Sequence, residues 1–120
     1  MKKVLVADDR ETGRELVRAV LENSGHQVFE ASDGLDAVEQ ARQIRPDLII
    51  LDIHMPGLDG FQVIEKLRAL EGFAVTPIIA LTASAMMGDR ERAMAAGFTG
   101  YITKPIRLDA LRTEVERLLA

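Results

Sequence analysis

Hydrophobic residues along this 120-residue chain alternate between short unbroken runs and longer stretches in which they recur at helical spacing. The short runs have the length of buried strands, and the longer stretches have the period of helices that pack on a sheet. The predicted strands are residues 4–7, 28–31, 48–51, 78–81 and 100–102, and the predicted helices are residues 11–23, 34–44, 61–70, 85–96 and 108–119.

Local signals at the ends of these stretches support the same boundaries. Asp33 is placed to cap the second helix, and Gly97 to end the fourth, because glycine tolerates the left-handed backbone that follows a helix. Apolar stripes mark the first helix at Leu16, Val17, Val20 and Leu21, and the last at Leu108, Leu111, Val115, Leu118 and Leu119. We therefore expect both helices to bury these stripes against a sheet.

Strands that alternate with helices along the whole chain are typical of α/β proteins. We expect a doubly wound parallel sheet with helices on both faces, because its strands read as continuous apolar runs. The length suits one hydrophobic core, and no repeat or linker interrupts the pattern. Residues 1–120 are therefore expected to form a single domain without an effector domain.

Composition narrows the possible functions. The chain has no cysteine, which excludes disulfides and thiolate metal sites. Its net charge of −4 argues against direct binding to nucleic acid, which requires a basic surface. The start, MKKVLVADD, is too poor in apolar residues for a signal peptide, and no run approaches the roughly 20 apolar residues that cross a bilayer. We expect a cytoplasmic protein that does not contact a membrane.

Polar residues that can bind ions or take part in reactions follow four of the predicted strands. Asp8 and Asp9 follow the first strand, Asp52 the third, Thr82 the fourth and Lys104 the fifth. In a doubly wound sheet, ligands bind beyond the carboxyl ends of the strands, so these side chains should meet at one edge. Three carboxylates there repel one another, and either shared protons or a hard cation would relieve the repulsion. Oxygen ligands favour Mg²⁺ or Mn²⁺ over zinc. A carboxylate beside a divalent ion and a lysine is suited to attack phosphorus and form an aspartyl phosphate.

Four motifs in this order resemble a known family. VLVADD, LIILDIHMPGLDG, IIALTA and YITKPI are similar to the motifs of the receiver domain of bacterial two-component response regulators, and the resemblance covers essentially the whole chain. It implies a flavodoxin-like (βα)5 fold with a five-stranded parallel sheet in the order 2-1-3-4-5. It also implies a phosphoacceptor that promotes its own phosphorylation and dephosphorylation and is not a turnover enzyme.

The resemblance implies a role for each motif residue. Asp52 would accept the phosphoryl group, and Lys104, joined to Pro105 by a cis peptide, would pair with its oxygens. Thr82 and Tyr101 would be the switch residues that respond to phosphorylation. The implied Mg²⁺ ligands are Asp8, Asp9, Asp52 and the backbone carbonyl of His54.

The resemblance also implies partners. The phosphoryl donor would be a histidine kinase or a histidine phosphotransfer protein, docked near residues 11–23 and the loop after Lys104. The receiver of the signal would be a downstream protein target. The chain would act as a monomer or as a phosphorylation-dependent homodimer.

Plainer interpretations of the same residues stay open at this point. Asp52 could be a turn residue, Thr82 the N-cap of the fourth helix, and Tyr101 an ordinary packing residue. The chain could also be a pseudo-receiver that serves only as an interaction module, or a receiver excised from a hybrid histidine kinase or a larger response regulator. A flavin carrier is disfavoured because the acids after the first strand would repel phosphate. A dehalogenase-type phosphatase is disfavoured because His54 stands where its second acid is required.

Overall fold

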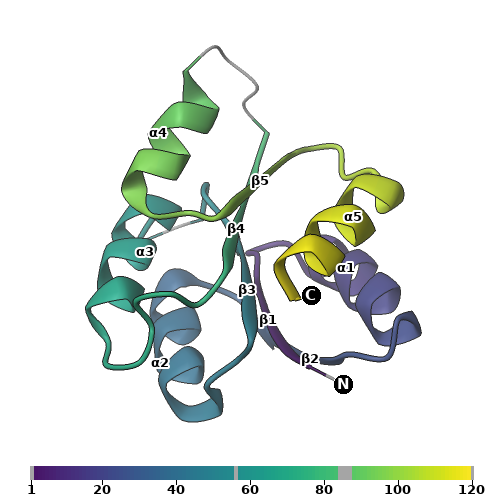
Figure 1. The fold of residues 1–120 in the computed structure, drawn as a ribbon, viewed down its shortest axis with the longest axis horizontal. Coiled ribbons are helices and arrows are strands. Elements are labelled where there is room, and N and C mark those ends of the chain that lie inside the picture. The colour runs from purple at the N-terminus through teal and green to yellow at the C-terminus, as the bar shows by residue number, and fades with distance from the viewer. Residues whose placement is uncertain (1, 56, 84–87, 120) are drawn as a thin grey trace.

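The fold is a five-stranded parallel sheet between two layers of helices (Figure 1). The computed structural model describes residues 2–55, 57–83 and 88–119. The strands lie in the order β2-β1-β3-β4-β5, so the predicted fold class and strand order are confirmed. The elements are β1 (Lys3–Ala7), α1 (Glu11–Asn23), β2 (Gln27–Ala31), α2 (Gly34–Ile44), β3 (Leu48–Asp52), α3 (Gly60–Ala69), β4 (Ile78–Thr82), α4 (Asp89–Ala96), β5 (Gly100–Thr103) and α5 (Leu108–Leu119).

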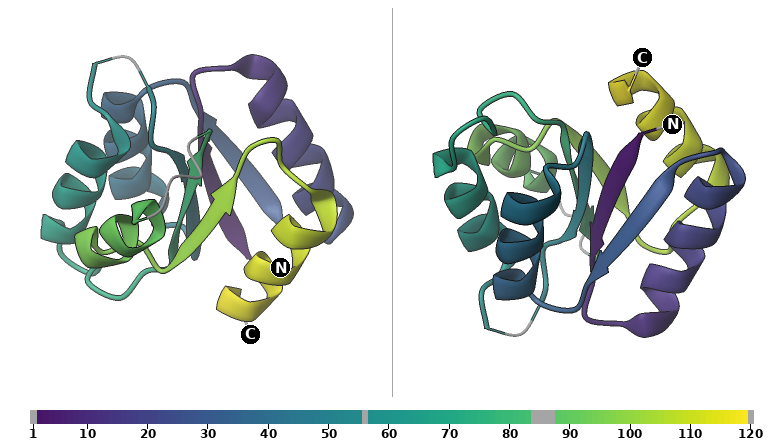
Figure 2. Two further views of the ribbon diagram at one scale, coloured as in Figure 1. Left: turned by 90° about the horizontal axis from the view of Figure 1, so that it is seen from above. Right: turned by 90° about the horizontal axis from the view of Figure 1, so that it is seen from below.

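Two hydrophobic clusters fill the space between the sheet and its helices. Helices α2, α3 and α4 cover one face of the sheet, and α1 and α5 cover the other (Figures 1 and 2). Successive residues of a strand point to opposite faces, so Leu5 packs in the first cluster while Val4 and Val6 pack in the second. The central strand β3 is buried along its whole length, and its last residue is Asp52. Within the described ranges, no helix is long and apolar enough to span a membrane.

The starts of α2 and α3 follow from local chemistry. Asp33 accepts a hydrogen bond from the backbone N–H of Asp36, which confirms it as the N-cap of α2. Helix α3 begins at Gly60, because Asp59 and Gln62 form a reciprocal capping box. The carboxylate of Asp59 thus sets the start of α3 one residue before the predicted position.

The described fourth helix is shorter than the predicted range of residues 85–96. Residues 84–87 lie outside the described ranges, and the described helix α4 begins at Asp89. Gly88 precedes it with φ of 92°, a left-handed conformation that interrupts any continuous helix through this position. Gly88 is also the N-cap, so the interpretation of Thr82 as that cap is wrong. Gly97 ends α4 as predicted.

Two leucines of the predicted apolar stripes are exposed. Leu16 on α1 is 43% exposed and Leu108 on α5 is 40% exposed, whereas Val17, Val20 and Leu111 are buried against the sheet. Helical spacing identifies the residues on one side of a helix but not how far the neighbouring elements extend over that side. An apolar residue near the edge of the stripe therefore stays accessible to partners.

Candidate functional site

Four polar residues stand where strands end at the carboxyl edge of the sheet. Asp8 follows β1, Asp52 ends β3, Thr82 ends β4 and Lys104 follows β5. The main chain continues the strand ladder through two of them: the Asp8 N–H donates to the Ala31 carbonyl at 3.1 Å, and the Lys104 N–H donates to the Thr82 carbonyl at 2.7 Å. These residues therefore lie on rigid backbone, as a site that depends on position requires.

Three of the predicted residues form an acidic cluster. Asp8, Asp9 and Asp52 each place a carboxylate oxygen within 4.8 Å of the others. Asp8 and Asp52 are 1% and 3% exposed, whereas Asp9 faces solvent. Carboxylate oxygens at this separation match the donors that hard divalent cations prefer, and the exposed side of the cluster leaves room for water ligands. The donor set thus fits Mg²⁺ or a similar ion.

Each buried carboxylate is partly neutralised by donors of the protein. One oxygen of Asp52 accepts the backbone N–H of His54 at 2.9 Å, and the other lies 2.7 Å from the Lys104 ammonium. Asp8 accepts the backbone N–H of Arg10 at 2.9 Å and lies 3.4 Å from the same ammonium. One lysine therefore bridges two strand ends that carry acids.

The acids control the charge of Lys104. Burial favours the neutral amine, but the hydrogen bond and negative charge of Asp52, together with Asp8, outweigh burial and raise the pKa of Lys104. The ammonium is therefore the stable form and offers a fixed positive charge beside Asp52. The Lys104–Pro105 peptide is cis, as the resemblance implied.

A cavity, here called the Thr82 cavity, lies next to the acidic cluster. It has a volume of about 130 Å³, and its lining includes Ile53, His54, Phe61, Thr82, Arg92 and Tyr101. The Thr82 hydroxyl lies 3.3 Å from the Nε2 atom of His54. Tyr101 is half-buried, and its pKa is raised by burial and by the charges of Asp89 and Glu91. The two predicted switch residues therefore share one cavity.

An open groove, here called the α1 groove, leads to the acids from the other side. It has a volume of about 540 Å³, and its lining includes Asp8, Thr12, Gly13, Leu16, Lys104 and Ile106. Gly13 was not among the predicted site residues, although it is required here, because a Cβ at this position would lie 2.6 Å from a carboxylate oxygen of Asp8. A glycine in the first turn of a helix that follows an acid pair was the available signal.

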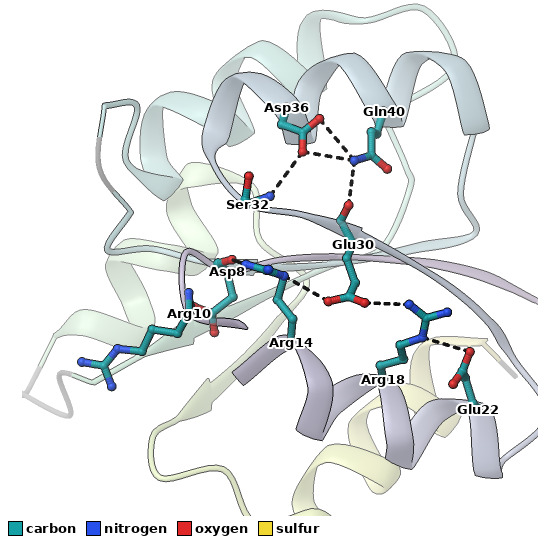
Figure 3. A network of polar contacts seen from close by, with 9 residues as sticks. All are labelled: Asp8, Arg10, Arg14, Arg18, Glu22, Glu30, Ser32, Asp36 and Gln40. Atoms are coloured by element: carbon teal, nitrogen blue, oxygen red, sulfur yellow. Dashed lines mark hydrogen bonds and ion pairs between the residues drawn. The ribbon is translucent and has the colours of Figure 1, made fainter. Parts of the chain in front are cut away.

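A network of ion pairs was also missed by the sequence analysis (Figure 3). Glu30 on the edge strand β2 pairs with Arg14 at 3.0 Å and with Arg18 at 2.6 Å, both on α1. Arg14 also donates to the backbone carbonyl of Asp8 at 2.8 Å. The network thus connects the sheet edge, through α1, to the backbone that carries the first acid.

The strands, the acids and the lysine together define a flavodoxin-like α/β protein with an acidic site of the phosphoacceptor class. The model of the response regulator receiver domain matches residues 4–116. The chain is 40% identical over 105 residues to the polar-differentiation response regulator DivK of Brucella anthropi, and the match covers 88% of this chain and 85% of the relative. The chain belongs to the response regulator receiver domain family and is a phosphoacceptor, not a classical enzyme.

Solved structures agree at the level of the fold. The chemotaxis response regulator CheY4 of Vibrio cholerae is 34% identical with a TM-score of 0.93, and the match covers 99% of both chains. The receiver domain of the sensor histidine kinase PA1611 from Pseudomonas aeruginosa is 35% identical with a TM-score of 0.90, over 98% of this chain and 97% of that one. That structure holds a magnesium ion in its active site cleft.

Proposed function

We propose that Asp52 accepts a phosphoryl group from a phosphohistidine of a histidine kinase or a histidine phosphotransfer protein. The observation that carries this proposal is the place of the Asp52 carboxylate, which is 3% exposed, ends a fully buried strand and lies 2.7 Å from Lys104. The interpretation of Asp52 as a simple turn residue does not account for this lysine. A rigid strand and a fixed ammonium are what in-line phosphoryl transfer requires of a protein.

The proposed reaction exchanges one bond to phosphorus for another. A carboxylate oxygen of Asp52 forms the new O–P bond while the P–N bond of the phosphohistidine breaks, and the electron pair of that bond returns to the donor imidazole. Lys104 faces the phosphoryl oxygens and offsets their charge. The backbone N–H of His54 holds the second carboxylate oxygen and fixes the plane of the nucleophile.

Asp8, Asp9, Asp52 and the backbone carbonyl of His54 are the proposed ligands of Mg²⁺ or Mn²⁺. The three carboxylates fit such an ion by their donor type and by their separation of at most 4.8 Å. These residues would hold the ion, and a bound ion would supply positive charge that offsets the charge of the phosphoryl oxygens. The role of the carbonyl of His54 is carried over from the family resemblance.

Thr82 and Tyr101 are proposed to report phosphorylation to the rest of the protein. The Thr82 hydroxyl would turn from its cavity toward a phosphoryl oxygen on Asp52, and Tyr101 would follow into the space that Thr82 leaves. The face formed by α4, β5 and α5 would then change its contacts with a downstream protein target. Phosphorylation-dependent dimerisation through this face stays a prediction, as do the cytoplasmic location and the absence of direct contact with nucleic acid.

The α1 groove is the proposed docking site for the phosphohistidine donor. It opens beside Asp8 and Lys104 and carries exposed apolar surface at Leu16. An apolar rim around a charged pocket suits a helix that buries apolar residues while its histidine reaches the acids.

Mass spectrometry tests the assignment of the phosphoacceptor. After treatment with acetyl phosphate and Mg²⁺, we expect one labile phosphoryl group on the wild-type protein and none on Asp52→Asn. Asp59→Asn, which alters an exposed aspartate that caps α3, serves as the matched control and should still be labelled. Labelling of Asp52→Asn at the wild-type level would overturn the proposal.

A further inference from the structure

His54 occupies the boundary between the two cavities of the site. The pocket that contains the acids has a lining that includes Asp9, Asp52, His54 and Lys104, whereas the Thr82 cavity has His54 and Thr82 in its lining. Among the described residues, His54 is the one that lines both. Thr82 lines only the second of them, so His54 is the residue that borders both the threonine and the acids.

The same residue contacts both Asp52 and Thr82. Its backbone N–H donates to Asp52 at 2.9 Å, and its ring nitrogen Nε2 lies 3.3 Å from the Thr82 hydroxyl. The hydroxyl is 28 positions further along the chain, so only the fold brings the two groups together. Thr82 is 2% exposed, so its hydroxyl is shielded from water, whereas His54 itself is exposed.

We propose that the His54 imidazole is a positioning residue that holds the Thr82 hydroxyl on the side of its cavity and away from Asp52. This inference rests on the proposed role of Thr82 as the switch hydroxyl. A hydroxyl that bonds to Nε2 has to leave that partner before it reaches a phosphoryl oxygen on Asp52. The imidazole therefore competes with the phosphoryl group and lowers the fraction of molecules that are switched before phosphorylation.

The distance sets the expected size of the effect. A hydrogen bond of 3.3 Å is longer than the common range, so its loss should change the resting equilibrium by about two- to tenfold and not by orders of magnitude. If the switched form is the one that reacts faster, the rate of phosphorylation should rise by the same factor. The imidazole thus reduces the fraction of unphosphorylated molecules that adopt the switched form.

Three substitutions separate the hydrogen bond from the bulk of the ring. His54→Phe keeps a ring at the boundary and removes the nitrogen atoms, His54→Gln keeps a hydrogen-bonding group, and His54→Ala removes both. All three keep the backbone N–H and carbonyl of residue 54. His26→Phe makes the same change at the second histidine of the chain, which lies outside the site, and is the matched control.

The direct measurement is the NMR chemical shift and χ1 coupling of Thr82 in the unphosphorylated protein. We expect His54→Phe to move both toward the values that wild type adopts with Mg²⁺ and beryllium fluoride, and we expect His54→Gln and His26→Phe to stay near wild type. In acetyl phosphate assays His54→Phe should react about two- to tenfold faster. In a Thr82→Val background, which has no hydroxyl to hold, the same substitution should have no effect.

The outcomes separate this inference from the proposed function. If wild type is labelled on Asp52 but His54→Phe leaves Thr82 and the rate unchanged, the inference is wrong and the phosphoacceptor assignment stands. An effect of His54→Ala without an effect of His54→Phe would show that bulk alone matters, which also overturns it. If wild type is not labelled, the assignment fails, and the NMR comparison still tests the contact.

Discussion

At the scale of single residues, the site depends on the absence of a side chain at Gly13 as well as on the side chains of the acids. The carboxylate of Asp8 is 1% exposed and fills the space that a side chain at Gly13 would need. The contact would be 2.6 Å, which is too short for a carbon and an oxygen that are not bonded. A glycine in the first turn of α1 therefore leaves space for the carboxylate of Asp8, although glycine destabilises a helix.

Gly13→Ala is predicted to impair the site without the usual gain in stability. Alanine in a helix is favoured by about 0.5–1 kcal/mol, but here it has to displace Asp8. We expect labelling by acetyl phosphate to slow by about tenfold or more, because small displacements of catalytic groups have large effects. Thr12→Ala on the same helix is the control and should change the rate little. An unchanged rate in Gly13→Ala would show that Asp8 adapts without consequence.

At the scale of elements, ion pairs connect the edge strand β2 to α1. The hydrogen bond from Arg18 lowers the pKa of Glu30, burial opposes this, and Arg14 adds to the lowering. The folded protein therefore binds this proton less readily than the unfolded chain. The stabilisation by Glu30 is present above the ordinary carboxyl pKa and is lost as the pH falls through the lower value of the folded state.

Glu30→Gln is predicted to weaken the dependence of the free energy of unfolding on pH in the acid range. The variant should be less stable than wild type from neutral pH down to the ordinary carboxyl pKa. Below that pKa the difference should shrink, because wild type loses the same ion pairs by protonation. Urea denaturation across this range measures it. Glu22→Gln removes an exposed pair with Arg18 and should have a smaller effect at every pH. A constant difference between Glu30→Gln and wild type would contradict the argument.

A single arginine joins α3, the loop before β4 and the end of α4. Arg68 donates to the backbone carbonyls of Phe73 at 2.7 Å, Thr76 at 2.6 Å and Gly97 at 2.7 Å. Burial lowers the pKa of Arg68, although the guanidinium of an arginine stays charged at any ordinary pH. This side chain therefore provides hydrogen bonds to three backbone carbonyls in the segments between strands and helices.

Arg68→Met is predicted to destabilise the protein by about 2–4 kcal/mol, because three carbonyls lose a charged donor. Lys66→Met makes the same kind of change at an exposed position of α3 and should stay within about 0.5 kcal/mol of wild type. Denaturation with urea compares the two. Equal small effects would mean that water replaces the arginine at all three carbonyls.

At the scale of the whole molecule, the sequence predicts what depends on neighbours in the chain. Helices α1, α2 and α5 have the predicted bounds, because caps and apolar spacing are local signals. The clustering of Asp8, Asp9 and Asp52 was predictable from the rule that the carboxyl ends of parallel strands lie at one edge of the sheet. The start of α4, the exposure of Leu16 and the space beside Gly13 depend on backbone angles and packing between distant segments, which no local pattern contains.

The acidic site also couples the stability of the whole fold to a divalent ion. Asp8 and Asp52 are buried within 4.8 Å of Asp9, and Lys104 is the cation that pairs with both buried acids. Three negative charges against one positive charge leave an excess that a bound cation relieves. A ligand that binds only the folded state shifts unfolding by mass action, so the melting temperature should depend on Mg²⁺.

Mg²⁺ at ten times its Kd is predicted to add about 1.4 kcal/mol to the free energy of unfolding and about 5 °C to the Tm. Asp8→Asn should lose most of this shift, and its metal-free form should melt above metal-free wild type, because the substitution removes one of the crowded charges. Asp109→Asn changes an exposed aspartate of α5 and should keep the full shift. Thermal melts with EDTA and with Mg²⁺ decide it: equal shifts in all three proteins would place the ion elsewhere. A metal-free Asp8→Asn that melts below wild type would mean that the pairing with Lys104 outweighs the repulsion among the acids.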